Sequence, residues 1–274
     1  MSLRINTNVA ALQTHRQLVD TDNRLSVSLE RLSSGYRINH AKDDVSGLAI
    51  ANKLRMEVRS LNMAQQNASQ AQSVLQVAEG GTNQIEAIVE RLKELATSAA
   101  SDNTDSAGRS NLNGEAQKLL SELDRIANNT KYGDTALLNA AINFTFQIGY
   151  ANSANDQISV STTSGLLSTN LGLSTVDLTT MGNAQTALTN IETSLTSINV
   201  ITGQIGAAQS RLEFASANLA ISIENISASQ SAIRDVDMAG EMTNLTRNQI
   251  LLQAGTAMLA QANTIPQTVL SLLK

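Results

Sequence analysis

Apolar side chains recur with helical spacing at both ends of the chain. Near the start, leucines stand at every seventh residue, at Leu18, Leu25 and Leu32. From Ile191 to Ile233 an isoleucine or leucine occupies every seventh position without a gap. A seven-residue apolar repeat of this length is typical of a coiled-coil seam. The pattern therefore predicts long helices that pack along narrow apolar stripes.

Two further segments keep the same period. One follows Asp43-Asp44 and carries two parallel heptad tracks, which begin at Leu61 and Ala64. The other repeats from Met238 onwards. Aspartates can cap a helix N-terminus, so Asp43-Asp44 predicts the start of the second helix. Pro266 disfavours helix at the preceding residue, and we expect the last helix to stop before it.

The period changes to two in the middle of the chain. Ile142, Phe144 and Phe146 alternate with polar residues, and a second short alternating run begins at Ile158. Alternation of this kind, with a loop between the two runs, indicates a β-hairpin. We expect a small β-hairpin region at about residues 140–178, inserted in a chain that is otherwise helical.

The predicted fold class is mainly α, with long coiled-coil helical hairpins or a bundle around the hairpin insert. Residues 1–44 and 235–274, the two chain ends, should pair as an inner coiled-coil domain, and residues 45–234 should form an outer rod-like helical domain. Short terminal helices bury too little apolar surface to offset their conformational entropy alone. We therefore expect the ends to order in an assembly. The residues predicted to drive self-assembly are the apolar positions of the terminal helices: Val9, Leu12, Val19, Leu25, Leu29, Leu32, Met238, Leu245, Leu252, Leu259, Leu270 and Leu273.

Composition excludes several kinds of chemistry. The chain has no Cys, which removes disulfide scaffolds, thiol catalysis and cysteine-based metal sites. A net charge of −5 and 2% aromatic residues disfavour a nucleic-acid binder. His15 and His40 lack metal-ligand spacing. Asp43-Asp44 could hold a metal, and Asp235 with Asp237 could mimic a catalytic pair, but helix capping is the favoured interpretation of both. We predict no enzyme activity, no cofactor and no metal site.

Three groups of residues carry a family resemblance. The first comprises Leu32-Ser33-Ser34-Gly35, Arg37-Ile38-Asn39, Ala41, Asp43-Asp44 and Gly47-Leu48-Ala49-Ile50. The second comprises Gln249-Ile250-Leu251, Gln253-Ala254-Gly255-Thr256, Leu259-Ala260-Gln261-Ala262-Asn263 and Pro266-Gln267. The third is Phe146-Gln147-Ile148-Gly149. They resemble, respectively, the N-terminal signature, the C-terminal signature and the hairpin of bacterial flagellin.

The resemblance implies a structural subunit that polymerises into the helical filament of the bacterial flagellum, for swimming motility. The chain resembles a short flagellin that lacks extra outer surface domains. Its partners would be further copies of itself, a flagellar export chaperone, the type III export machinery, and the hook-junction and cap proteins. It would reach the extracellular filament without a cleaved signal peptide, and the resemblance implies neither nucleic-acid nor membrane binding.

The resemblance also implies an innate-receptor contact. Arg91, Leu95 and Glu115 match the positions through which a host Toll-like receptor senses flagellins. Glu90 stands where a glutamine is usual beside the arginine.

Two other functions are alternatives. A hook–filament junction protein shares the terminal-helix plan but caps the assembly, and the C-terminal motifs favour flagellin over it. A surface enzyme or adhesin would need a chemical site or a large exposed domain, and the sequence indicates neither.

Overall fold

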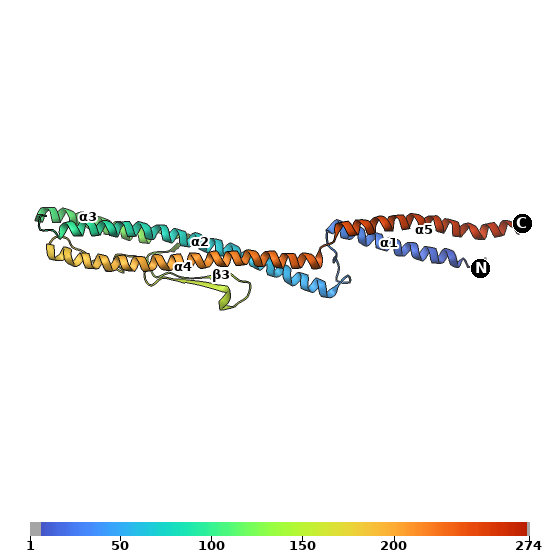
Figure 1. Cartoon of the computed structure of the whole chain (residues 1–274), viewed down its shortest axis with the longest axis horizontal. Coiled ribbons are helices and arrows are strands. Elements are labelled where there is room, and N and C mark those ends of the chain that lie inside the picture. Colours follow the sequence, from blue (N-terminus) through green and yellow to red (C-terminus); the bar gives the residue numbers. More distant parts are fainter. Residues whose placement is uncertain (1–6, 273–274) are drawn as a thin grey trace. The chain divides into compact units, whose positions relative to one another are not determined.

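A computed structural model describes residues 7–272, with side chains described up to residue 264. That part of the chain is mainly helical, with two short antiparallel hairpins, which confirms the predicted fold class (Figure 1). Its elements are α1 (Val9–Ser34), α2 (Val45–Ala99), α3 (Ser106–Asn129), β1 (Lys131–Tyr132), β2 (Thr135–Ala136), β3 (Asn143–Gln147), the short 3₁₀ turn Ala154–Asp156, β4 (Gln157–Ser161), α4 (Met181–Arg234) and α5 (Met238–Leu272).

The chain divides into two compact units. The central unit is Glu57–Glu224, and the paired-end unit comprises the residues up to Met56 and those from Asn225 onwards. Both divisions fall inside long helices, α2 and α4, rather than at the connectors near residues 44 and 235 where the sequence suggested boundaries.

The central unit is held together by the heptad positions of its helices. On α2, every position of the two predicted tracks from Leu61 to Ala99 is buried. On α4, the seven-residue repeat from Ile191 to Leu219 is buried as well. Together with α3 these stripes form one continuous apolar core, and the three helices lie side by side (Figure 1). The sequence pattern correctly predicted the core of this unit.

The predicted hairpin is present. Strands β3 and β4 pair antiparallel, with Phe144 opposite Val160 and Phe146 opposite Ile158. Val160 and Ile158 are buried, whereas the two phenylalanines are partly buried against the core. The hairpin therefore contributes apolar side chains to the helical core through one face only.

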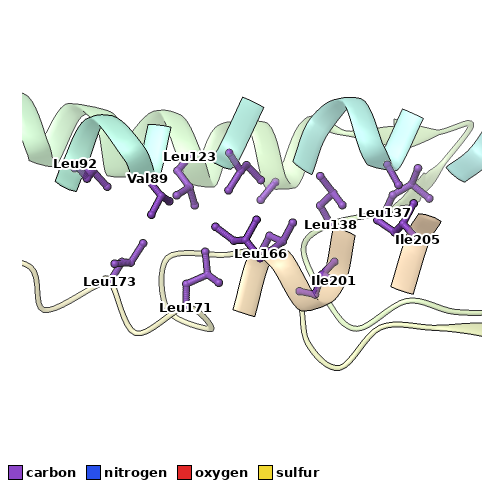
Figure 2. Close-up of a cluster of buried hydrophobic side chains, with 14 of the residues drawn as sticks. Val89, Leu92, Leu123, Leu137, Leu138, Leu166, Leu171, Leu173, Ile201 and Ile205 are labelled. Atoms are coloured by element: carbon purple, nitrogen blue, oxygen red, sulfur yellow. The ribbon is translucent and has the colours of Figure 1, made fainter. Parts of the chain in front are cut away.

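The segment that follows the hairpin has no strand and closes the core with leucines. Leu166, Leu171 and Leu173 are buried and face the side chains of α2 and α3 (Figure 2). Helix α3 holds the segment by its polar side chains. Asp124 accepts hydrogen bonds from the backbone N–H and the hydroxyl of Ser168, each at 2.8 Å. Side chains of α3 thus satisfy backbone groups of this irregular segment.

The last helix is longer than predicted. The sequence predicts an end before Pro266, but α5 continues to Leu272. A proline inside a helix removes one backbone hydrogen bond and crowds the preceding turn, at a cost of about 3 kcal/mol. Because α5 has 35 residues, cooperative hydrogen bonding on both sides carries the helix through this local cost. The predicted end was wrong for that reason.

Two adjacent glycines of α2 meet different surroundings. A Cβ at Gly81 would lie 2.6 Å from Leu138 Cδ1 and 2.7 Å from Thr130 Oγ1, whereas a Cβ at Gly80 would meet nothing within 4 Å. Leu138 is buried. The absence of a Cβ at Gly81 therefore permits the close approach of the segment after α3. At Gly80 there is room for a Cβ.

We expect Gly80→Ala to raise the free energy of unfolding of the central unit by up to about 1 kcal/mol, since alanine is the better helix former. The free energy of unfolding of Gly81→Ala should lie at least about 1 kcal/mol below that of Gly80→Ala, because overpacking against Leu138 and Thr130 offsets the gain in helix propensity. Urea unfolding of the full-length monomer, followed by far-UV circular dichroism, measures both. Equal stability of the two variants would contradict the close approach at Gly81.

Candidate interaction surface

Helices α1 and α5 form an antiparallel pair in the paired-end unit (Figure 1). Near one end of the pair, Asn8 Nδ2 donates to the carbonyl oxygen of Ala262 at 2.8 Å. Near the other end, Arg31 lies 3.8 Å from the carboxylate of Glu241. Gly255 lies between these points, against the side chain of Leu18. The pairing therefore extends over most of α1.

Two connectors of the paired-end unit, the segment after α1 and the segment between α4 and α5, hydrogen-bond to each other. Arg37 N donates to the carbonyl of Arg234 at 2.7 Å, and Val236 N donates to the carbonyl of Gly35 at 3.0 Å. The Arg234 guanidinium lies 4.1 Å from the centre of the Tyr36 ring. Gly35 has φ +75°, a conformation that glycine adopts at little cost. These contacts fix the points at which α1 ends and α5 begins.

Asp44 and Asp237 cap helices, as the favoured interpretation predicted, whereas Asp43 accepts from backbone N–H groups of its own connector. Asp44 Oδ1 accepts from Gly47 N at 2.8 Å at the start of α2, and Asp237 Oδ1 accepts from Ala239 N at 3.0 Å at the start of α5. Backbone hydrogen bonds, above all from His40, hold the pKa of Asp43 below its usual value. The carboxylates thus stabilise local backbone.

The α1–α5 pair has little apolar core of its own. Leu245 is the one large apolar side chain that is buried among the residues of α1 and α5 whose side chains are described. The other buried side chains of the pair are small or polar: Thr21, Ser28, Glu241, Asn248 and Ala262. This contrasts with α2, where both heptad tracks are buried throughout. Packing between the two helices therefore uses only a small part of their apolar surface.

The remaining apolar surface of the pair is exposed. Large apolar side chains of α1 and α5 that are more than a third exposed are Val9, Val19, Val27, Leu12, Leu29, Met238, Met242, Met258, Ile250 and Leu251. Full burial of one such side chain is worth about 1.5–3 kcal/mol. Exposed apolar surface of this extent is typical of a protein interface.

The structure separates the predicted self-assembly residues into three groups. Val9, Leu12, Val19, Leu29 and Met238 are exposed, while Leu25, Leu32, Leu252 and Leu259 are half-buried and Leu245 is buried in the seam. Leu270 and Leu273 lie outside the residues whose side chains are described. The heptad pattern therefore found both the seam between α1 and α5 and part of the exposed surface.

The heptad pattern missed five exposed apolar residues: Val27, Met242, Ile250, Leu251 and Met258. They lie off the seven-residue tracks, so an account based on one apolar stripe omits them. The sequence does contain a signal for them, because α1 and α5 carry apolar residues on several faces. A helix of that kind needs partners on several faces.

The predicted receptor-contact residues come from α2 and α3 of the central unit. Arg91 Nη2 donates to Glu115 Oε1 at 3.0 Å, and Arg91 Nη1 donates to Glu94 Oε2 at 2.7 Å. These hydrogen bonds, first that of Glu94, raise the pKa of Arg91. Leu95 is only 3% exposed. The structure thus brings Arg91 and Glu115 together on the surface and places Leu95 in the core.

Residues 7–272 include no group of three or more His, Cys, Asp or Glu side chains arranged to hold a metal ion. Over the same residues, no helix combines the length and the apolar character needed to cross a membrane.

Comparisons with known proteins agree on one family. Models described as the bacterial flagellin N-terminal helical region and the bacterial flagellin C-terminal helical region match residues 5–143 and 188–273. The chain is 38% identical to a flagellin of Halalkalibacterium halodurans over 98% of this chain and 99% of the relative. It is 36% identical to a flagellin of Bacillus subtilis over 99% and 100%. The crystal structure of Bacillus cereus flagellin overlaps 56% of this chain and 88% of its own, with a TM-score of 0.48 and 22% identity.

The thin core between α1 and α5 predicts early cleavage at both chain ends. Segments with few buried apolar contacts open locally at low free-energy cost, and proteases cut them first. Limited proteolysis of the monomer should therefore remove α1 and α5 and leave a fragment that contains α2, α3 and α4. Mass spectrometry identifies the cut sites. Survival of both helices for as long as α2, α3 and α4 would contradict this account.

Proposed function

This chain belongs to the bacterial flagellin family and is a subunit of the flagellar filament, and we propose that the exposed apolar side chains of α1 and α5 drive its polymerisation. The family is a structural one and forms the extracellular filament. The comparisons with flagellins do not favour the hook–filament junction protein, which was the alternative. The proposed role requires no catalytic step.

A single observation carries the proposal. On α1 and α5, Leu245 is buried while Ile250, Leu251 and other large apolar side chains of similar size remain exposed. A monomer that keeps such side chains in water loses the stabilisation that burial would give, about 1.5–3 kcal/mol for each. Contact with further copies of the chain removes this surface from water. Assembly thus supplies the packing that the isolated pair lacks.

The same surface suits the remaining partners that the family resemblance implies. Before polymerisation α1 and α5 present apolar side chains, so an export chaperone that covers α5 would prevent premature association. We extend the proposal to the export machinery, export without a cleaved signal peptide, and contacts with the hook-junction and cap proteins. Each of these uses a chain end in an unassembled or terminal subunit.

Ile250→Gln should impair polymerisation and leave the monomer folded. Ile250 is 60% exposed, so the monomer loses no core packing, whereas the filament would bury an amide in an apolar contact. We expect the monomer concentration left in equilibrium with filaments to rise at least about tenfold, the equivalent of about 1.4 kcal/mol. Sedimentation of filaments measures it, and circular dichroism checks the monomer.

Tyr150→Gln is the matched control. Tyr150 lies near the hairpin of the central unit and is 58% exposed, so the same loss of an exposed apolar side chain occurs away from α1 and α5. Polymerisation of this variant should stay within about twofold of the unmodified chain, as for other neutral surface changes. Equal behaviour of the two variants would refute a special role of the α1–α5 surface.

We also propose that Arg91 and Glu115 form the receptor-contact surface that the resemblance implies. Both are exposed and joined by a hydrogen bond, whereas the burial of Leu95 leaves it a supporting role beneath them. Arg91→Ala should reduce activation of a cell line that expresses the receptor at least about tenfold, the effect of losing an interface arginine. Arg125→Ala is the control, because Arg125 is an exposed arginine of α3 that also pairs with a glutamate. Equal loss in both variants would contradict the assignment.

A further inference from the structure

A polar groove of about 410 Å³ lies on one flank of the α1–α5 pair. Arg24 and Arg31 of α1 line it together with Arg247 and Asn248 of α5. Val27 and Leu251, two of the exposed apolar residues, lie at the same groove. The groove thus combines guanidinium and amide donors with apolar side chains.

The groove has an excess of positive charge. Arg31 faces Glu241 at 3.8 Å, and Glu241 is itself only 8% exposed, so this pair is internally balanced. Arg24 and Arg247 form no ion pair with any residue that the structure describes. Two guanidinium groups are therefore available to an anion, and each can donate two parallel hydrogen bonds to a carboxylate.

One buried donor in the groove also lacks a partner. The Nε of Arg31 is buried and forms no hydrogen bond within the described chain. Buried polar groups are normally satisfied by a hydrogen-bond partner. The unpaired Nε is consistent with an acceptor that reaches the groove from outside the chain.

An acidic side chain stands on the opposite flank of α1. Asp22 is exposed and forms no ion pair with the residues that the structure describes. Because each helical residue turns by about 100°, Asp22 lies about 200° around α1 from Arg24. Val19 and Leu29, three residues before Asp22 and seven after it, share its flank and are exposed. This flank thus combines an acid with apolar side chains, as the groove combines bases with apolar side chains.

We propose that Asp22 of one subunit docks in the Arg24–Arg247 groove of a neighbouring subunit in the filament. An open helical assembly requires a heterologous contact, in which two different patches of the same chain meet. The acidic and basic flanks of the α1–α5 pair are such patches. The carboxylate accepts hydrogen bonds from the arginines, and the apolar side chains beside each group exclude water from the contact. The inference rests on the proposed function. It adds to the apolar contacts a charged contact that sets how neighbouring subunits align.

Charge reversal tests the pairing. Arg247→Glu and Asp22→Arg should each slow salt-induced polymerisation at least about tenfold, because like charges meet in a desolvated contact. The double variant Asp22→Arg/Arg247→Glu should polymerise at least about threefold faster than either single variant, since the introduced arginine then meets the introduced glutamate, while the unchanged Arg24 prevents full recovery. Circular dichroism of each monomer checks that the helices remain.

Glu90→Arg in place of Asp22→Arg is the control. Glu90 is also exposed, but it lies on α2 in the central unit. The double variant Glu90→Arg/Arg247→Glu should therefore polymerise as slowly as Arg247→Glu alone. Normal polymerisation of the single charge reversals overturns the pairing, and so does a failure of the Asp22 double variant to exceed them. Loss of polymerisation in Ile250→Gln tests the apolar surface independently of these outcomes.

A cross-link locates the contact directly, because the chain has no cysteine of its own. Subunits with Asp22→Cys and subunits with Arg247→Cys are each diluted into unmodified subunits, polymerised together and oxidised. Covalent dimers should appear in the mixture and stay absent from filaments that hold only one of the two variants. Absence of dimers from the mixed filaments would overturn the proposed contact.

Discussion

The interaction on which the rest depends is the packing between α1 and α5, and it is weak in apolar content. Leu245 is buried there, but its neighbours in the seam are threonine, serine, asparagine, alanine and a glutamate. Hydrogen bonds and small side chains align two helices at close range without strong hydrophobic stabilisation. The pair is thereby defined in geometry while its larger apolar side chains face outward. Under the proposed function, the subunit gains further stabilisation when these side chains contact neighbouring subunits.

The central unit follows the opposite rule. The two heptad tracks of α2 from Leu61 to Ala99 are buried within the chain, together with the stripes of α3 and α4. The irregular segment that contains Leu166 and Leu171 closes this core, and Asp124 satisfies its backbone (Figure 2). The unit therefore buries its apolar stripes within the chain. Under the proposed function, the exposed apolar side chains of α1 and α5 become buried only in the polymer.

Sequence periodicity predicted what depends on regular spacing. The helices, their buried tracks and the β3–β4 hairpin follow from periods of seven and two, because burial on one face repeats with the backbone geometry. Periodicity did not predict the path of residues 166–178. The leucines of this segment are spaced irregularly, and side chains of α3 hold its backbone. The end before Pro266 failed because a local rule competed with cooperative helix formation along α5.

The candidate surface was predicted in part for a related reason. A heptad repeat identifies the stripe that faces one partner, and Leu245 and Leu252 lie on it. It does not identify Ile250 or Leu251, because neither residue lies on the seven-residue track, although both are exposed. Nor does periodicity reveal that Arg24 and Arg247, more than two hundred positions apart in the chain, line one groove. That juxtaposition follows from the antiparallel register of α1 and α5. In the proposed assembly, apolar side chains supply the stabilisation, and polar groups select the register in which identical subunits pack.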